Sequence, residues 1–228
     1  MKIWPWNAIL AEGIGTFFFF FVGIGASSIG GTIGVVGVAL AHGIVLAVMV
    51  SSLGAISGGH FNPAVTFGIW MASRLDNRRA IAYVIAQLLG AVLAAVAIGY
   101  VSNVPDAVAA GTPALANGID VGRGIVIEAI LTAILLTAVF GTAVDPRAPK
   151  TIAGLGIGLA VTADIFMGGT LTGGAMNPAR WFGPALVAGK FDNAIVWIAG
   201  PLLGAAVVAA IYRLLFLPEA DAQTGADV

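Results

Sequence analysis

The sequence predicts an all-α membrane protein with six transmembrane helices and two re-entrant half-helices in an inverted repeat. Three observations favour this fold class. Hydrophobic residues make up 59% of the 228-residue chain and charged residues only 9%, whereas an ordinary soluble domain carries about 25% charged residues. Six apolar stretches are long enough to cross a bilayer. One twelve-residue motif occurs twice.

The six predicted spans are identified by their length, because a helix needs about 20 apolar residues to cross the hydrocarbon core. They cover residues 8–29, 35–55, 80–101, 124–144, 152–168 and 194–217. Glycines between Gly30 and Gly37 leave the turn between the first two spans undefined. We expect a single membrane domain over residues 1–217 and a polar, disordered tail at 218–228.

Two further apolar segments are too short to cross the membrane. One runs from Asn62 to the residue before Arg74, and the other from Asn177 to about Ala188. Short apolar segments of this kind are typical of re-entrant elements, which are tolerated where protein buries them or water lines them. Two of them therefore predict a lined path through the molecule.

Basic residues predict the orientation of the chain. If the first re-entrant segment returns to its own side, seven basic residues share one face, and Arg123 and Lys190 lie on the other. Arg180 belongs to the second re-entrant segment. Because cytoplasmic loops carry the excess of Lys and Arg, we expect both termini in the cytoplasm and a location in the cell (plasma or inner) membrane. The seven are Lys2, Arg74, Arg78, Arg79, Arg147, Lys150 and Arg213.

An internal repeat divides the chain into halves at about 1–105 and 120–217. Residues 57–68 read SGGHFNPAVTFG and residues 172–183 read TGGAMNPARWFG, so seven of twelve positions are identical. Glu12 and Glu128 recur at nearly the same spacing. Each half holds three spans and one re-entrant segment. Because three is odd, the second half must be inverted relative to the first, as in many transport proteins.

The shared core of the repeat is an Asn-Pro-Ala triplet, which has a physical consequence. Asn is a strong helix N-cap and Pro favours the first helical position, so each triplet begins a half-helix. In an inverted pair both positive dipole ends face the midplane, where they oppose protons and cations but not neutral molecules. Each Asn amide can also donate to a passing oxygen. The triplets are Asn62, Pro63 and Ala64, and Asn177, Pro178 and Ala179.

These motifs, with the AEGIGT and IEAILT segments that open the halves, resemble those of the aquaporin family (the major intrinsic proteins) from about residue 8 to 217. The resemblance implies one pore per subunit and a homotetramer. It also implies a selectivity filter formed by His42, Ile165, Gly174 and Arg180. This set is similar to the filter of plant tonoplast intrinsic proteins that pass ammonia. Ile165 and Gly174 should make the constriction wider and less polar, unless His42 swings across it.

The resemblance assigns roles to three further polar residues. Glutamates at the positions of Glu12 and Glu128 brace the re-entrant loops in this family, although a proton relay is the alternative. A histidine at the position of His60 lines the inner vestibule, where a pH gate or a bond to the backbone is possible. Two residues have no assigned role. Asp164 could pair with Arg123, bond to a loop or face a subunit interface, and Trp181 stands where the family has a small residue.

The leading functional hypothesis is a passive water channel that also passes ammonia or other small neutral solutes and excludes protons and ions. The expected partners of such a channel are water, small neutral solutes, the lipid bilayer and further copies of the chain. We expect no cofactor, metal or nucleic acid. The alternatives are a proton-coupled secondary transporter, a glycerol-type facilitator and a closed scaffold protein. An enzyme is disfavoured because no GxSxG or HExxH motif occurs. The absence of cysteine predicts insensitivity to thiol-directed mercury.

Overall fold

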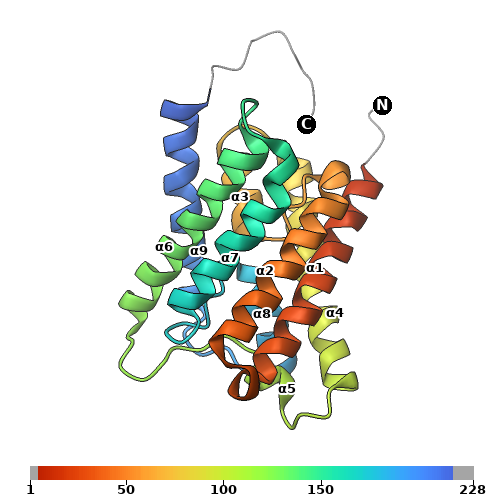
Figure 1. The fold of residues 1–228 in the computed structure, drawn as a ribbon, viewed down its shortest axis with the longest axis vertical. Coiled ribbons are helices and arrows are strands. Elements are labelled where there is room, and N and C mark those ends of the chain that lie inside the picture. Colours follow the sequence, from red (N-terminus) through yellow and green to blue (C-terminus); the bar gives the residue numbers. More distant parts are fainter. Residues whose placement is uncertain (1–4, 218–228) are drawn as a thin grey trace.

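The computed structural model describes residues 5–217 as a bundle of long helices, shown in Figure 1. Six helices of this part of the chain are long and apolar enough to cross a membrane, and no strand occurs among its residues. The predicted fold class is therefore confirmed. The predicted tail at 218–228 lies outside the described residues. The elements are α1 (Trp6–Ser28), α2 (Gly30–Ser57), α3 (Pro63–Met71), α4 (Asn77–Val101), α5 (Ala107–Ala110), α6 (Val121–Val139), η1 (Phe140–Val144), η2 (Lys150–Ile152), α7 (Ala153–Gly168), α8 (Pro178–Ala188), α9 (Ile195–Ile211) and η3 (Tyr212–Phe216).

Two spans begin earlier than their apolar sequence predicts, because capped polar turns precede them. Asp76 caps α4 by accepting a hydrogen bond from the backbone N–H of Arg79 at 3.0 Å. Asp120 caps α6 in the same way, with the N–H of Arg123 at 2.9 Å. An Asp N-cap satisfies a free N–H of the first turn, so each helix extends by about one turn beyond the apolar stretch.

The turn between the first two spans contains an interrupted helix. α1 ends at Ser28 and α2 begins at Gly30, but Gly34 has φ 68° and ψ 173°, which breaks the regular helix. That backbone conformation lies in a region that only glycine adopts readily. The regular part of α2 therefore begins at about the residue that the apolar sequence predicts.

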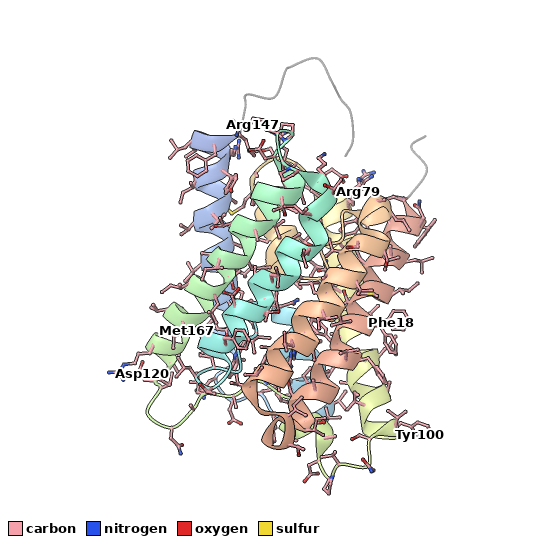
Figure 2. All side chains as sticks on the ribbon, viewed as in Figure 1. Phe18, Arg79, Tyr100, Asp120, Arg147 and Met167 are labelled. Carbon is pink, nitrogen blue, oxygen red and sulfur yellow. The ribbon has the colours of Figure 1, made fainter. Side chains whose placement is uncertain are left out.

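The outer surface of the bundle is apolar along its length. Phe18 and Met167 project from opposite sides of the bundle in Figure 2 and are 46% and 59% exposed. Large aliphatic side chains on every span are exposed in the same way. Because a soluble protein rarely exposes a continuous apolar surface of this extent, the outside of the bundle is suited to lipid.

The two half-helices, α3 and α8, lie inside the bundle and exchange partners between the halves. α3 of the first half packs against α9 of the second, and α8 of the second half packs against α4 of the first. The pairs α1–α4 and α6–α9 pack in equivalent ways. A methyl group at Gly90 or at Gly204 would overlap a backbone carbonyl of the facing helix. Small residues thus let the paired spans approach closely.

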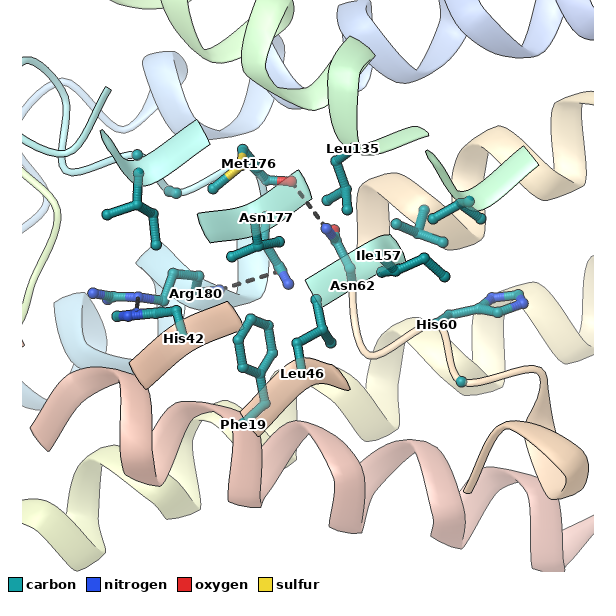
Figure 3. A pocket seen from close by; sticks show the side chains of 17 residues that line it. Phe19, His42, Leu46, His60, Asn62, Leu135, Ile157, Met176, Asn177 and Arg180 are labelled. Atoms are coloured by element: carbon teal, nitrogen blue, oxygen red, sulfur yellow. Dashed lines mark hydrogen bonds between the residues drawn. The ribbon is translucent and has the colours of Figure 1, made fainter. Parts of the chain in front are cut away.

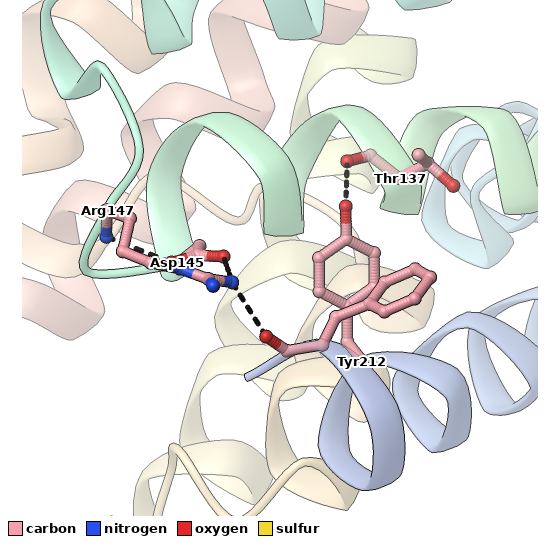
Figure 4. A network of polar contacts seen from close by, with 5 residues as sticks. Thr137, Asp145, Arg147 and Tyr212 are labelled. Carbon is pink, nitrogen blue, oxygen red and sulfur yellow. Dashed lines mark hydrogen bonds and ion pairs between the residues drawn. The ribbon is translucent and has the colours of Figure 1, made fainter. Parts of the chain in front are cut away.

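One end of the bundle carries the start of α1, the end of η3 and the connection between α6 and α7, as Figures 1 and 2 show. There the guanidinium of Arg147 donates to Asp145 at 2.7 Å and to the carbonyl oxygen of Phe216 at 2.7 Å (Figure 4). Hydrogen bonds from Arg147 lower the pKa of the Asp145 carboxyl to about 2. The last span is thereby connected to the loop that follows α6.

Candidate functional site

The two half-helices begin at the Asn-Pro-Ala triplets, and each Asn side chain caps its own helix. Oδ1 of Asn62 accepts from the N–H of Ala64 at 2.8 Å, and Oδ1 of Asn177 accepts from the N–H of Ala179 at 2.9 Å. Both caps have extended backbones and proline follows each of them at the first helical position. The structure therefore places both helix N-termini as the sequence predicts.

The amide nitrogens of the same two side chains connect the halves to each other. Nδ2 of Asn62 donates to the carbonyl oxygen of Met176 at 2.9 Å, a bond that Figure 3 shows, and Nδ2 of Asn177 donates to that of Phe61 at 3.0 Å. Phe61 and Met176 have positive φ angles of 46° and 52°. Sequence reasoning missed these two acceptors; the only available signal was their position directly before each Asn. One N–H of each amide stays available to a neighbour.

Glu12 accepts the free donors of the first re-entrant loop. Its carboxylate accepts from the backbone N–H groups of His60 at 2.9 Å and Phe61 at 2.7 Å. The Ser57 hydroxyl at 2.7 Å and the Gln87 amide at 2.8 Å complete the set. Glu12 is fully buried, so these donors satisfy a carboxylate that has no access to water.

Glu128 makes the equivalent contacts in the second loop. Its carboxylate accepts from the N–H groups of Ala175 at 3.0 Å and Met176 at 2.7 Å and from the Thr172 hydroxyl at 2.6 Å. It is also fully buried. Both glutamates therefore make the contacts that a loop-bracing role requires, and all the donors come from the re-entrant loops except Ser57, at the end of α2, and the Gln87 side chain on α4.

Arg180 and His42 are in direct contact at one end of the central cavity. The Arg180 Nε donates to His42 Nε2 at 3.1 Å, and His42 Nδ1 lies 2.9 Å from the carbonyl oxygen of Val38. Because an arginine N–H can only donate, the imidazole must accept at Nε2 and donate at Nδ1. This network assigns His42 as a neutral ring that is held by two hydrogen bonds.

The cavity runs between the half-helices and past Arg180, as Figure 3 shows. Arg180 and His42 lie at one end of it, His60 lies towards the other, and Asn62 and Asn177 lie between them. This cavity has a volume of only about 20 Å³, whereas a vestibule beyond it has a volume of about 310 Å³. Arg180 and Ile165 line both the cavity and the vestibule, so the narrow passage that joins these two spaces lies at the two residues.

Ile165 and Gly174 line the same cavity as the Arg180–His42 pair. The structure thus brings all four predicted filter residues to one cavity. His60 also lines it, and its ring nitrogen Nδ1 lies 3.1 Å from the Thr66 hydroxyl while its backbone is held by Glu12.

Trp181, which departs from the family pattern, faces away from the cavity. Its ring stacks on Trp197 with centroids 5.9 Å apart and packs edge-on against Phe191. The Trp197 indole donates to the carbonyl oxygen of Thr172 at 3.0 Å. The aromatic cluster therefore supports the loop that holds Gly174.

Asp164 does not pair with an arginine. Its side chain is 1% exposed, and among the described residues neither carboxylate oxygen has a hydrogen-bond partner. The expected partner, Arg123, binds Asp120 and the carbonyl oxygen of Gly118 instead. Nothing in the structure explains this aspartate.

The fold and the cavity together define a class of protein: a membrane channel built from an inverted repeat, with two half-helices that meet inside it. The chain belongs to the major intrinsic protein family, whose pattern it matches over residues 1–212. Members of this family are channels, and the chain is not an enzyme.

Known relatives support this membership over nearly the whole chain. The chain is 43% identical to "Aquaporin TIP4-4" of Zea mays, covering 93% of this chain and 88% of the relative. It is 41% identical to "Lens fiber major intrinsic protein" of Gallus gallus, covering 94% and 83%. Its fold is similar to the X-ray structure of the aquaglyceroporin from Plasmodium falciparum, with a TM-score of 0.82, 26% identity and coverage of 93% and 97%.

We predict that Glu12→Gln and Glu128→Gln each destabilise the folded protein. The glutamine amide replaces one accepting oxygen of the carboxylate with an NH₂ group, which faces loop N–H groups that also donate. Each buried donor left unpaired in this way costs about 1–3 kcal/mol. The melting temperature of each variant in detergent should fall below that of the wild type. Asp192→Asn, which makes the same change of charge at an exposed position, should leave it unchanged. Unchanged melting together with lost transport would instead favour a proton relay.

Proposed function

We propose that this protein is a passive channel for water. The observation that supports it most strongly is the narrow central cavity, which apolar side chains line except at a few points. The polar side chains along it are His42, His60, Asn62, Asn177 and Arg180. A water molecule can move past such a wall by exchanging hydrogen bonds at a few fixed positions, and no bound group is needed.

The electrostatics of the cavity favour neutral solutes. The positive dipole ends of α3 and α8 point towards its middle, and the Arg180 guanidinium adds a full positive charge at one end. The N–H left free on each Asn amide can donate to the oxygen of a passing water. A water bound to Asn62 and Asn177 at once has both lone pairs occupied, so it cannot accept a proton from its neighbour.

Reconstituted protein is expected to increase the osmotic shrinkage rate of vesicles well above that of empty vesicles. Stopped-flow light scattering measures the rate, with protein content verified by blotting. Leu46→Trp should abolish the increase, because Leu46 lines the cavity and a larger ring fills it. Val48→Trp on the same helix is the matched control, since Val48 is 50% exposed on the outer surface.

The result that would refute a water channel is a wild-type rate equal to that of empty vesicles at verified protein content. Equal loss in both tryptophan variants would show that the effect of Leu46→Trp is not due to filling the cavity. Mercuric chloride should not reduce the wild-type rate, because the chain has no cysteine.

We further propose that ammonia shares the pathway. The support is the composition of the constriction: Ile165 presents an aliphatic side chain, Gly174 presents none, and the acceptor nitrogen of the His42 ring is bonded to Arg180. Such a wall requires less exact hydrogen bonding from a solute than a fully polar ring does. A glycerol-type facilitator is the alternative, and glycerol-driven swelling of the same vesicles tests for it.

Vesicles loaded with a pH-sensitive dye are expected to become alkaline faster with the protein than without it after an ammonium gradient is applied. Ile165→His should lower the ratio of ammonia to water permeability, because it adds a polar group to the constriction. Ile165→Val, which keeps an aliphatic wall, should preserve the ratio. An unchanged ratio in Ile165→His would contradict the role assigned to this residue.

The same proposal includes the setting of the channel. We propose a homotetramer in the cell membrane with both termini cytoplasmic. The orientation is supported by the excess of basic residues at the end of the bundle where α1 begins: Arg79 and Arg147 lie at that end in Figure 2, and Asp120 lies at the other. The homotetramer and the membrane follow from the family resemblance alone.

A further inference from the structure

One stripe of the first helix faces the Arg180–His42 pair. Phe19, Gly23 and Ser27 are four residues apart, so they lie on the same side of α1. The Phe19 ring packs edge-on against His42 with centroids 6.1 Å apart. A methyl group at Gly23 would lie 2.6 Å from His42 Nε2, so the absence of a side chain there lets the imidazole reach Arg180. No motif in the sequence marks this stripe.

Ser27 contacts the arginine itself. Nη2 of Arg180 donates to the Ser27 hydroxyl at 2.9 Å, and Nη1 donates to the carbonyl oxygen of Gly111 at 2.8 Å. With Nε on His42, each guanidinium nitrogen is held by a different part of the chain. The Ser27 hydroxyl is half-buried and lines the vestibule. Solvent there competes for the N–H groups of Arg180.

We propose that Ser27 is a positioning residue for the filter, which holds the Arg180 guanidinium at the wall of the constriction. The Arg180 guanidinium has three acceptors. The Ser27 hydroxyl is half-buried, whereas the other two are the backbone carbonyl of Gly111 and the buried ring of His42. Arg180 is 3% exposed and lines both the cavity and the vestibule. Without the Ser27 hydroxyl, Nη2 loses this partner, and the guanidinium can turn into the space that it lines.

This inference rests on the proposed water channel and predicts a specific kinetic change. Ser27→Ala should lower the channel-mediated water permeability per reconstituted protein about two- to fivefold, because conformers with the guanidinium across the pore then reach populations similar to or above the open one. It should also raise the Arrhenius activation energy of that permeability. A reduced amount of folded protein would lower the permeability but leave this activation energy unchanged.

Two variants control the experiment. Ser27→Thr keeps a hydroxyl at the same position and should restore wild-type values. Ser28→Ala removes the neighbouring hydroxyl, which donates to the carbonyl oxygen of Gly25 at 2.7 Å on the same helix, and should behave as wild type. Stopped-flow light scattering over a range of temperatures measures all four proteins.

The outcomes separate this inference from the proposed function. If the wild type conducts water and Ser27→Ala matches it in both permeability and activation energy, the positioning role is wrong. If the wild type does not conduct, the water channel is wrong, and crystal structures of Ser27→Ala and Ser28→Ala decide the positioning role. A shifted or split Arg180 side chain in Ser27→Ala alone supports it, and an unmoved side chain overturns it.

Discussion

The arrangement depends on one reciprocal interaction: each half-helix begins at an Asn whose amide bonds to the loop that precedes the other half-helix. The bonds from Asn62 to Met176 and from Asn177 to Phe61 join the two halves at the centre of the bundle. Because the same two side chains also cap α3 and α8, the positions of the helix ends and the contact between the halves are fixed together. The dipoles that oppose cations depend on this alignment.

A re-entrant loop inside a membrane has backbone donors that water cannot satisfy, so the protein must supply acceptors. Glu12 and Glu128 do so from the first span of each half, with nearly identical contacts. The halves differ where selectivity is expected. Arg180 follows the second triplet, whereas Val65 follows the first, and the contacts of Arg180 reach α1, α2 and the loop after α5. A symmetric scaffold thus holds an asymmetric constriction.

The sequence predicted the spans and the half-helices, because apolar length, Asn-Pro signals and an internal repeat are local patterns. The four filter residues were implied by the family resemblance, and all four line one cavity. It did not predict acceptors that depend on three-dimensional contact. Ser27 and the carbonyl oxygen of Gly111 bind Arg180 from distant segments, and neither residue type is distinctive. Likewise, the aromatic partners of Trp181 come from beyond its own helix, so its departure from the family pattern could be noticed but not explained.

The central claim is that the aligned half-helices pass water while they exclude protons. The most direct test measures both fluxes in the same proteoliposomes, with osmotic shrinkage for water and the decay of an imposed pH gradient, in the presence of a potassium ionophore, for protons. The account predicts a large gain in water permeability and a proton leak equal to that of empty vesicles. A proton leak that rises with the amount of protein, or solute uptake driven by the pH gradient, would contradict it.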